Sequence, residues 1–96
     1  MPLNGHNILI VEAEIGPFVV ALQHGLEACG ADSLVARGPE EALVRAREFS
    51  FTAVIAHRDL AEFEDQLSLP TLLYSSNEAE READAIVARL KRRLSI

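Results

Sequence analysis

The sequence predicts an α/β domain in which helices cover both faces of a four-stranded parallel sheet. The first observation is a set of four short apolar runs, each the length of one strand. The second is that most of the segments following these runs carry apolar residues at helical spacing, which indicates βαβ units. The third is the composition, 49% hydrophobic but only 5% aromatic, so the core must consist of Ala, Val, Leu and Ile. Since 96 residues suffice for one small core, a single domain over residues 1–96 is expected.

The strands are predicted from runs that do not alternate polar and apolar residues. Such runs are typical of strands that are covered on both faces. The predicted strands are residues 8–11, 32–36, 52–56 and 70–75. In a parallel sheet of this kind, a working site lies at the carboxyl ends of the strands, near the topological switch point.

The helices are predicted from their start signals and their apolar stripes. Two helices begin at Pro17 and Pro39, because Pro at the first helical position loses no hydrogen bond and each Pro follows a Gly. Gly30 ends the first helix. Residues 60–67 carry a weaker helical signal. For the last helix, Asn77 and Glu80 form a possible capping box, and its apolar stripe comprises Ala83, Ile86, Val87, Leu90 and Leu94.

Charge and composition argue against several classes of function. The net charge of −6 disfavours binding to a phosphate backbone, and the basic run at residues 91–93 suits a helix C-terminus. Cys29 is the single cysteine, so an intramolecular disulfide and a CxxC motif are both excluded. No apolar run approaches ~20 residues. We therefore expect a soluble, cytoplasmic protein that binds neither nucleic acid nor membrane.

Three segments carry a resemblance to a known family. HNILIVEAE, GPEEALVRAREFSFTAVIAHRDL and LPTLLYSS, in that order, resemble the receiver domain of two-component response regulators, over residues 6–76. The resemblance implies a flavodoxin-like three-layer sandwich with strand order 2-1-3-4. The usual fourth helix and fifth strand have no room, because few residues separate residue 75 from the terminal helix. The chain is therefore expected to be a single degenerate, shortened receiver-like domain.

The resemblance also implies a phospho-acceptor pocket that has lost its key groups. In a typical receiver, two acidic residues after the first strand and an aspartate ending the third strand hold Mg²⁺, and that aspartate accepts the phosphoryl group. Here Glu12 matches the first acidic position, but Ala13 occupies the second and His57 the acceptor. Lysine, which contacts the phosphate in receivers, is absent before Lys91. The vestigial pocket would comprise Glu12, Ala13, His57, Asp59 and Ser75, and Mg²⁺ binding is expected to be weak or absent.

His57 admits three interpretations. It could accept a phosphoryl group itself, although histidine phosphorylation usually involves a dedicated partner domain. It could bind a transition metal together with Glu12 and Asp59, since imidazole with carboxylates suits Zn²⁺ or Ni²⁺. The simplest interpretation is a half-buried polar residue that forms a hydrogen bond near Glu12, with Arg58 facing solvent.

The fourth strand is predicted to lie at an edge of the sheet, because no fifth strand follows it. An apolar edge without charges invites pairing with another chain, and the simplest closed assembly is a two-fold homodimer. The alternative is that residues 61–67 and the terminal helix cover the edge. The predicted interface comprises Pro70, Thr71, Leu72, Leu73, Tyr74, Ile86 and Leu90.

These observations predict a non-catalytic, phosphorylation-independent module that signals through dimer or protein-partner contacts. The alternative is an atypical response regulator that still responds to a metal or phosphoryl ligand at the remnant pocket. An enzyme is not expected, because the sequence has no Gly-rich phosphate loop and no paired-carboxylate or Ser/Cys–His pattern of known type.

Overall fold

The computed structural model describes residues 3–74 and 82–94, without the side chains of residues 62–64. Strands and helices alternate along the chain as the sequence predicts. The elements are β1 (Asn7–Val11), α1 (Pro17–Ala28), β2 (Asp32–Ala36), α2 (Pro39–Glu48), β3 (Ala53–His57), the 3₁₀ segment η1 (Arg58–Phe63), α3 (Glu64–Leu67), β4 (Thr71–Tyr74) and α4 (Ala83–Arg93).

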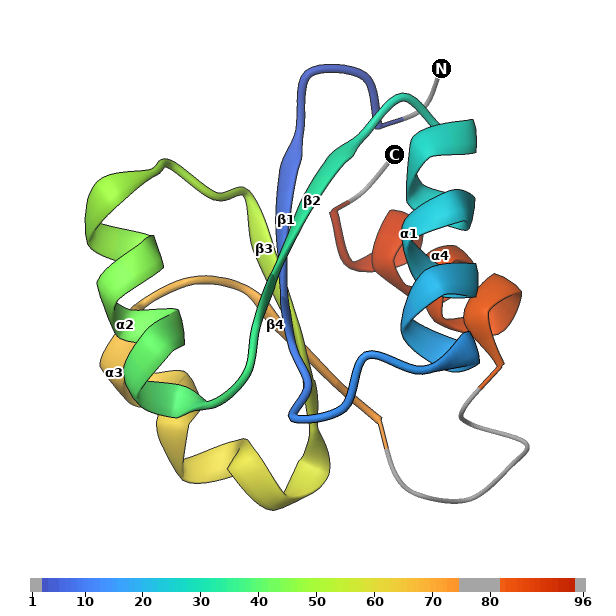
Figure 1. The fold of residues 1–96 in the computed structure, drawn as a ribbon. Helices are drawn as coiled ribbons and strands as arrows, with labels where there is room; N and C mark the ends of the chain where they lie inside the picture. Colours follow the sequence, from blue (N-terminus) through green and yellow to red (C-terminus); the bar gives the residue numbers. More distant parts are fainter. Residues whose placement is uncertain (1–2, 75–81, 95–96) are drawn as a thin grey trace.

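The sheet confirms the predicted topology. Its strands are parallel and lie in the order β2-β1-β3-β4. Figure 1 shows the sheet edge-on, with α1 and α4 on one face and α2 and α3 on the other. The result is a sandwich of three layers, in which β1 and β3 are central and β2 and β4 are the edge strands of the described sheet.

The core lies on both faces of the sheet because successive side chains of a strand point to opposite faces. Ile8 and Ile10 of β1 pack with α1 and α4, whereas Leu9 and Val11 pack with α2 and the loops beside it. A strand buried on both faces has no polar side, which explains why the apolar run of β1 is continuous.

The prolines and glycines that predicted the helix ends lie at those ends in the structure. Pro17 and Pro39 occupy the first turns of α1 and α2, with Gly16 and Gly38 as the N-cap residues. The chain leaves α1 through Gly30, whose φ of 87° lies in the left-handed region that glycine adopts without strain. This reversal carries the chain directly into β2.

Some boundaries differ from the prediction. β3 extends to His57, and the weak helical signal after it becomes a 3₁₀ segment followed by a single turn of α-helix. The capping residues Asn77 and Glu80, and also Ser75, lie outside the described residues, and the described part of α4 begins at Ala83. None of the helices within residues 3–74 and 82–94 has the length and apolar character needed to span a bilayer.

Candidate functional site

An open pocket of about 270 Å³ lies where β1, β2 and β3 end and α2 begins. Parallel strands bring their carboxyl ends to the same edge of the sheet, which is why residues far apart in sequence meet here. Four of the five predicted pocket residues are together at this site, and the fifth, Ser75, lies outside the described residues. The lining consists of Val11, Glu12, Ala13, Arg37, Gly38, Pro39, His57, Asp59 and Leu60.

Tyr74 forms a hydrogen bond with Glu12, one of the two acidic residues in the pocket lining. Its side chain is fully buried at the end of β4, and its hydroxyl donates a hydrogen bond to Oε2 of Glu12. The Glu12 backbone is held as well, because its N–H donates to the carbonyl of Ala36 at 2.9 Å. A hydrogen bond to a carboxylate is stronger than one between neutral groups, so the Glu12 side chain is oriented toward β4.

Aromatic contacts hold Tyr74 from two sides. The Phe18 ring of α1 lies 5.2 Å from the Tyr74 ring, measured between centroids. The His57 ring lies 5.5 Å away and meets Tyr74 edge-on, at an interplanar angle of 82°. This contact follows from the strand register, because His57 of β3 is directly opposite Tyr74 of β4. His57 and Glu12 are thus joined through one buried phenol.

His57 forms a local bond with the residue two positions ahead. The backbone N–H of Asp59 donates to Nδ1 of His57 at 3.1 Å, so the neutral ring carries its proton on Nε2. The Asp59 carboxylate lies 3.4 Å from the same nitrogen, but its side chain is 89% exposed, whereas that of His57 is 24% exposed. As the simplest interpretation predicted, His57 is half-buried and Arg58 is exposed. Glu12, however, accepts a hydrogen bond from the Tyr74 hydroxyl.

The pocket lining contains both acidic and basic side chains. Glu12 and Asp59 supply carboxylates, Arg37 supplies a cation, and the methyl group of Ala13 stands at the second acidic position of the resemblance. Within residues 3–74 and 82–94, no group of three or more His, Cys, Asp or Glu side chains is placed to hold a metal ion.

The predicted interface requires a correction. Tyr74, Ile86 and Leu90 are fully buried in the core between the sheet and α1, and Thr71 and Leu72 are nearly so. These side chains therefore cannot provide an exposed apolar flank. Leu73 is half-buried, and among the predicted interface residues only Pro70 is exposed. α4 packs against both α1 and β4 and so covers this side of the sheet, which was the alternative considered for the edge.

Several lining residues, Arg37 and Leu60 among them, and one supporting residue were not among the five assigned to the pocket from sequence. Arg37 follows β2 and Leu60 lies in η1, and both reach the pocket because η1 and α2 begin at the same edge. Tyr74 was assigned to the interface instead. In the parallel register of β3 and β4, Tyr74 stands opposite His57. Because paired strands end together, assigning His57 to the pocket would also have placed Tyr74 beside it.

Comparisons with known proteins show the fold. No family model matches the chain, and no curated protein matches it significantly. Among solved structures, the Vibrio cholerae chemotaxis protein CheY4, a response regulator receiver domain, matches with a TM-score of 0.62 at 12% sequence identity, covering 91% of this chain and 97% of that chain. Identity this low is informative about the fold alone. The chain therefore folds as a receiver domain, a flavodoxin-like α/β sandwich with four parallel strands.

Proposed function

We propose that this chain is a non-catalytic, phosphorylation-independent receiver-like module that signals through contacts with another protein. The observation that carries the proposal is the state of the pocket. Glu12 in its lining accepts a hydrogen bond from a buried tyrosine, and a histidine stands at the position that the resemblance to receivers assigns to the phospho-acceptor. A receiver fold whose phosphoryl chemistry is lost retains its surfaces, and these are what a partner can recognise.

The chemistry of phosphoryl transfer supports this reasoning. The reaction depends on Mg²⁺ and on cancellation of the charge of the transferred group. Mg²⁺ requires hard oxygen ligands in a nearly octahedral arrangement. Ala13 offers no oxygen from its side chain, His57 offers nitrogen, and Glu12 is already engaged by Tyr74. An aspartyl phosphate cannot form at position 57.

We expect the pocket to bind neither Mg²⁺ nor a mimic of the phosphoryl group. In a two-dimensional amide NMR titration with Mg²⁺, and then with Mg²⁺ plus beryllofluoride, the signals of Glu12, Ala13, His57 and Asp59 should show no saturable shift. The physical reason is the missing oxygen ligands at positions 13 and 57. Saturable shifts confined to these four residues would contradict the proposal.

The second candidate function is an atypical regulator that still binds a ligand in this pocket. The observation that favours it is the pocket itself, which remains open at about 270 Å³ and keeps Glu12, Asp59, Arg37 and His57 in its lining. A small anion or a metal ion would be the ligand. The same NMR titration distinguishes the two candidates. An atypical regulator should show saturable shifts of the pocket residues on adding the ligand, whereas a phosphorylation-independent module should show none.

Restoring the missing carboxylates should restore metal binding. We expect the double variant Ala13→Asp/His57→Asp to bind Mg²⁺ saturably, because three carboxylates would then converge on the pocket, together with Glu12. Isothermal titration calorimetry with Mg²⁺ checks this result. The matched control is Glu14→Asp/Arg58→Asp, which places new Asp residues at the exposed neighbouring positions. Equal Mg²⁺ binding by both variants would mean that added negative charge, and not the pocket, attracts the metal.

The proposed partner is a protein, either a different chain or a second copy of this one, and the proposed location is the cytoplasm. The net charge of −6 supports a protein partner over nucleic acid or an anionic membrane surface. The response regulator fold supports an interaction role.

A further inference from the structure

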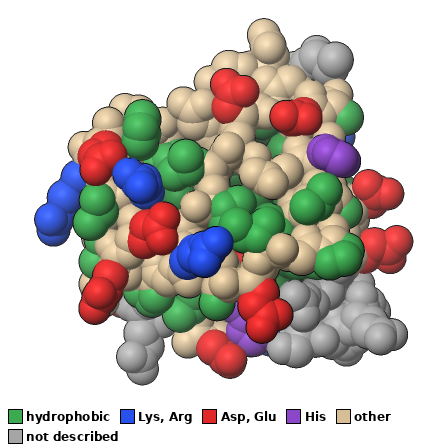
Figure 2. Space-filling view, viewed as in Figure 1, with side chains coloured by type: hydrophobic (Ala, Val, Ile, Leu, Met, Phe, Trp, Pro, Cys, Tyr) green, Lys and Arg blue, Asp and Glu red, His purple; other side chains and the backbone are tan. Residues whose placement is uncertain are grey.

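The chain enters β1 through an exposed turn, residues 3–6. The N–H of His6 donates a hydrogen bond to the carbonyl of Leu3 at 3.0 Å, and Gly5, the third residue of the turn, has a φ of 82°. A positive φ at that place is typical of a type II turn. Asn4 and Gly5 are both exposed. Figure 1 shows the turn at the edge of the sheet opposite the carboxyl ends of the strands, and the same end of the molecule projects at the top of Figure 2.

Asn4 and Gly5 form a dipeptide that favours loss of the side-chain amide. Asparagine is a thermolabile residue, because the backbone nitrogen of the next residue can attack its side-chain carbonyl carbon. A side chain on that next residue crowds the attack. Gly5 has no Cβ, and a Cβ placed there would meet no heavy atom within 4 Å beyond the adjoining residues. Within residues 3–74 and 82–94, neither the Asn4 amide nor the Gly5 N–H has a hydrogen-bond partner, so both reacting groups are free.

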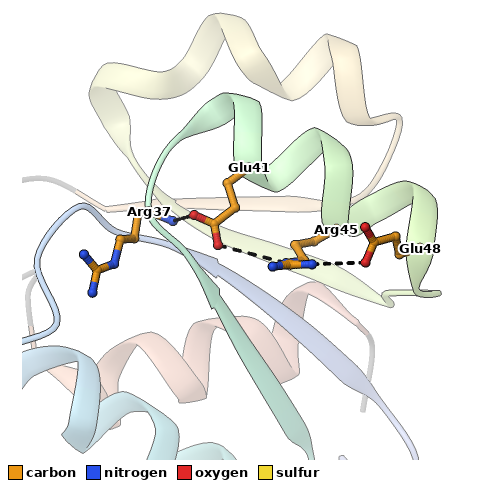
Figure 3. Close-up of polar contacts among 4 residues, drawn as sticks. All are labelled: Arg37, Glu41, Arg45 and Glu48. Carbon is orange, nitrogen blue, oxygen red and sulfur yellow. Dashed lines mark hydrogen bonds and ion pairs between the residues drawn. The ribbon is translucent and has the colours of Figure 1, made fainter.

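Backbone N–H groups in two other exposed loops are engaged. After β2, the N–H of Arg37 donates to Oε2 of Glu41 at 3.2 Å, and Figure 3 shows this contact at the start of α2. After β3, the N–H of Asp59 donates to Nδ1 of His57 at 3.1 Å. A backbone nitrogen attacks only after losing its proton, and an acceptor that holds the N–H opposes that loss. The Gly5 nitrogen is therefore a more available nucleophile than either of these.

Asn7 provides an internal comparison. Its Nδ2 donates a hydrogen bond to the carbonyl of Ser50 at 3.2 Å, which restrains the side chain. The next residue, Ile8, is β-branched and fully buried, and it is paired in register with Ser33 of β2 and Ala53 of β3. A nitrogen held in the middle of a sheet beside a branched side chain cannot reach the amide. The same chemistry is thus blocked at the start of β1.

We propose that Asn4 is a site of spontaneous deamidation. The Gly5 nitrogen loses its proton and bonds to Cγ of Asn4, and the side-chain amide leaves as ammonia, which closes a succinimide ring. Water then opens the ring at one of its two carbonyl carbons. Opening at Cγ leaves aspartate at position 4, whereas opening at the backbone carbonyl leaves Gly5 joined through Cγ, as isoaspartate. No oxidant or reductant is needed, and water is the other reactant.

Isoaspartate at this place should loosen the anchor before β1, because it adds one carbon atom to the main chain. Leu3 is fully buried on one side of the turn, and its N–H donates to the carbonyl of Cys29 at 2.9 Å. On the other side, the carbonyl of His6 accepts from the N–H of Asp32 at 3.0 Å. A longer turn between two fixed ends displaces one of them, and the packed core gives little room for this. The stability of the fold then declines with the age of the chain, which goes beyond the proposed function and does not depend on the pocket.

Peptide mass mapping of the full chain during incubation at physiological temperature tests the modification. Fragmentation that distinguishes isoaspartate from aspartate should show both products at Asn4 and an unchanged amide at Asn7. Conversion should be faster at mildly alkaline than at neutral pH, because the attacking nitrogen must lose its proton. Asn4→Gln should abolish the modification of this segment, since glutamine would have to close a larger ring. The matched control, Asn7→Gln, should leave the conversion of Asn4 unchanged.

Urea denaturation tests the consequence for the anchor. Aged wild-type chain, with isoaspartate at position 4, should unfold at lower urea concentration than fresh chain. Fresh Asn4→Asp should unfold with the fresh wild type, because it carries the new charge without the added main-chain atom and the position is exposed. Asn4→Gln aged in the same way should show no shift, which separates this site from every other effect of incubation.

Three results would overturn the inference. The first is an Asn4 amide that persists while other amides of the chain are lost. The second is conversion of Asn7 as fast as that of Asn4, which would mean that neither the turn nor the hydrogen bond to Ser50 matters. The third is an aged, isoaspartate-containing chain that unfolds at the same urea concentration as the fresh one. None of these results bears on binding of Mg²⁺ or beryllofluoride, so this inference and the proposed function fail separately.

Discussion

Leu90→Ala is expected to lower the free energy of unfolding by about 3 kcal/mol, the typical cost of removing a fully buried leucine side chain. Leu90 lies on the inner face of α4, with no exposed surface, among core residues contributed by α1 and the sheet. A truncated side chain there leaves a cavity that the neighbouring strands cannot close, because they are held in register on both sides. Urea denaturation followed by circular dichroism measures the change.

The control for Leu90→Ala is Arg92→Ala, on the exposed side of the same helix, which should change stability by no more than about 0.5 kcal/mol. The comparison also decides what Leu90 does. An interface residue would lose dimer affinity on truncation and keep its monomer stability. A core residue loses stability, and any self-association would fall only as far as unfolding reduces the folded population. If Leu90→Ala and Arg92→Ala were equally stable, Leu90 would not be a core residue, and its predicted place in an interface would be supported.

Tyr74→Phe is expected to destabilise the fold by about 1.5 kcal/mol, as for the loss of a hydrogen bond to a charged group. The phenyl ring keeps the contacts with Phe18 and His57, so the change isolates the hydroxyl. The carboxylate of Glu12 is only half-buried and can regain a water molecule, which keeps the loss below that of a fully buried charge. The measurement is again urea denaturation, at neutral pH.

A double-mutant cycle separates the Tyr74–Glu12 bond from general packing. Glu12→Gln keeps an acceptor oxygen but removes the charge, so the combined variant with Tyr74→Phe should cost less than the sum of the two single changes. We expect a coupling free energy of about 1 kcal/mol. Strict additivity would mean that the two side chains do not interact in solution and that Tyr74 does not compete with a ligand for Glu12.

Much of the fold could be predicted from the sequence because its signals are local. The apolar run of β1 predicted a strand buried on both faces, and the Gly-Pro pairs predicted where α1 and α2 begin. Gly30 predicted the end of α1, since the turn there needs a left-handed residue. The strand order then came from the resemblance to receiver domains, and the sheet confirms it. The pocket residues Glu12, Ala13, His57 and Asp59 were also found, because parallel strands end at one edge.

By itself, the sequence determined the alternation of elements and which residues follow the ends of the strands, whereas the sheet order came from the resemblance to receiver domains. Only the tertiary structure decided how those residues are used, since that depends on distances between strands that sequence spacing does not contain. It buried Tyr74 against Phe18 and His57, and it directed the Tyr74 hydroxyl to Glu12. The structure also places Ile86 and Leu90 in the core and not in the predicted interface, because the apolar stripe of α4 packs on α1 and the sheet. A helical stripe predicts that one face will be buried, but not against which surface, and that choice is made when the layers pack.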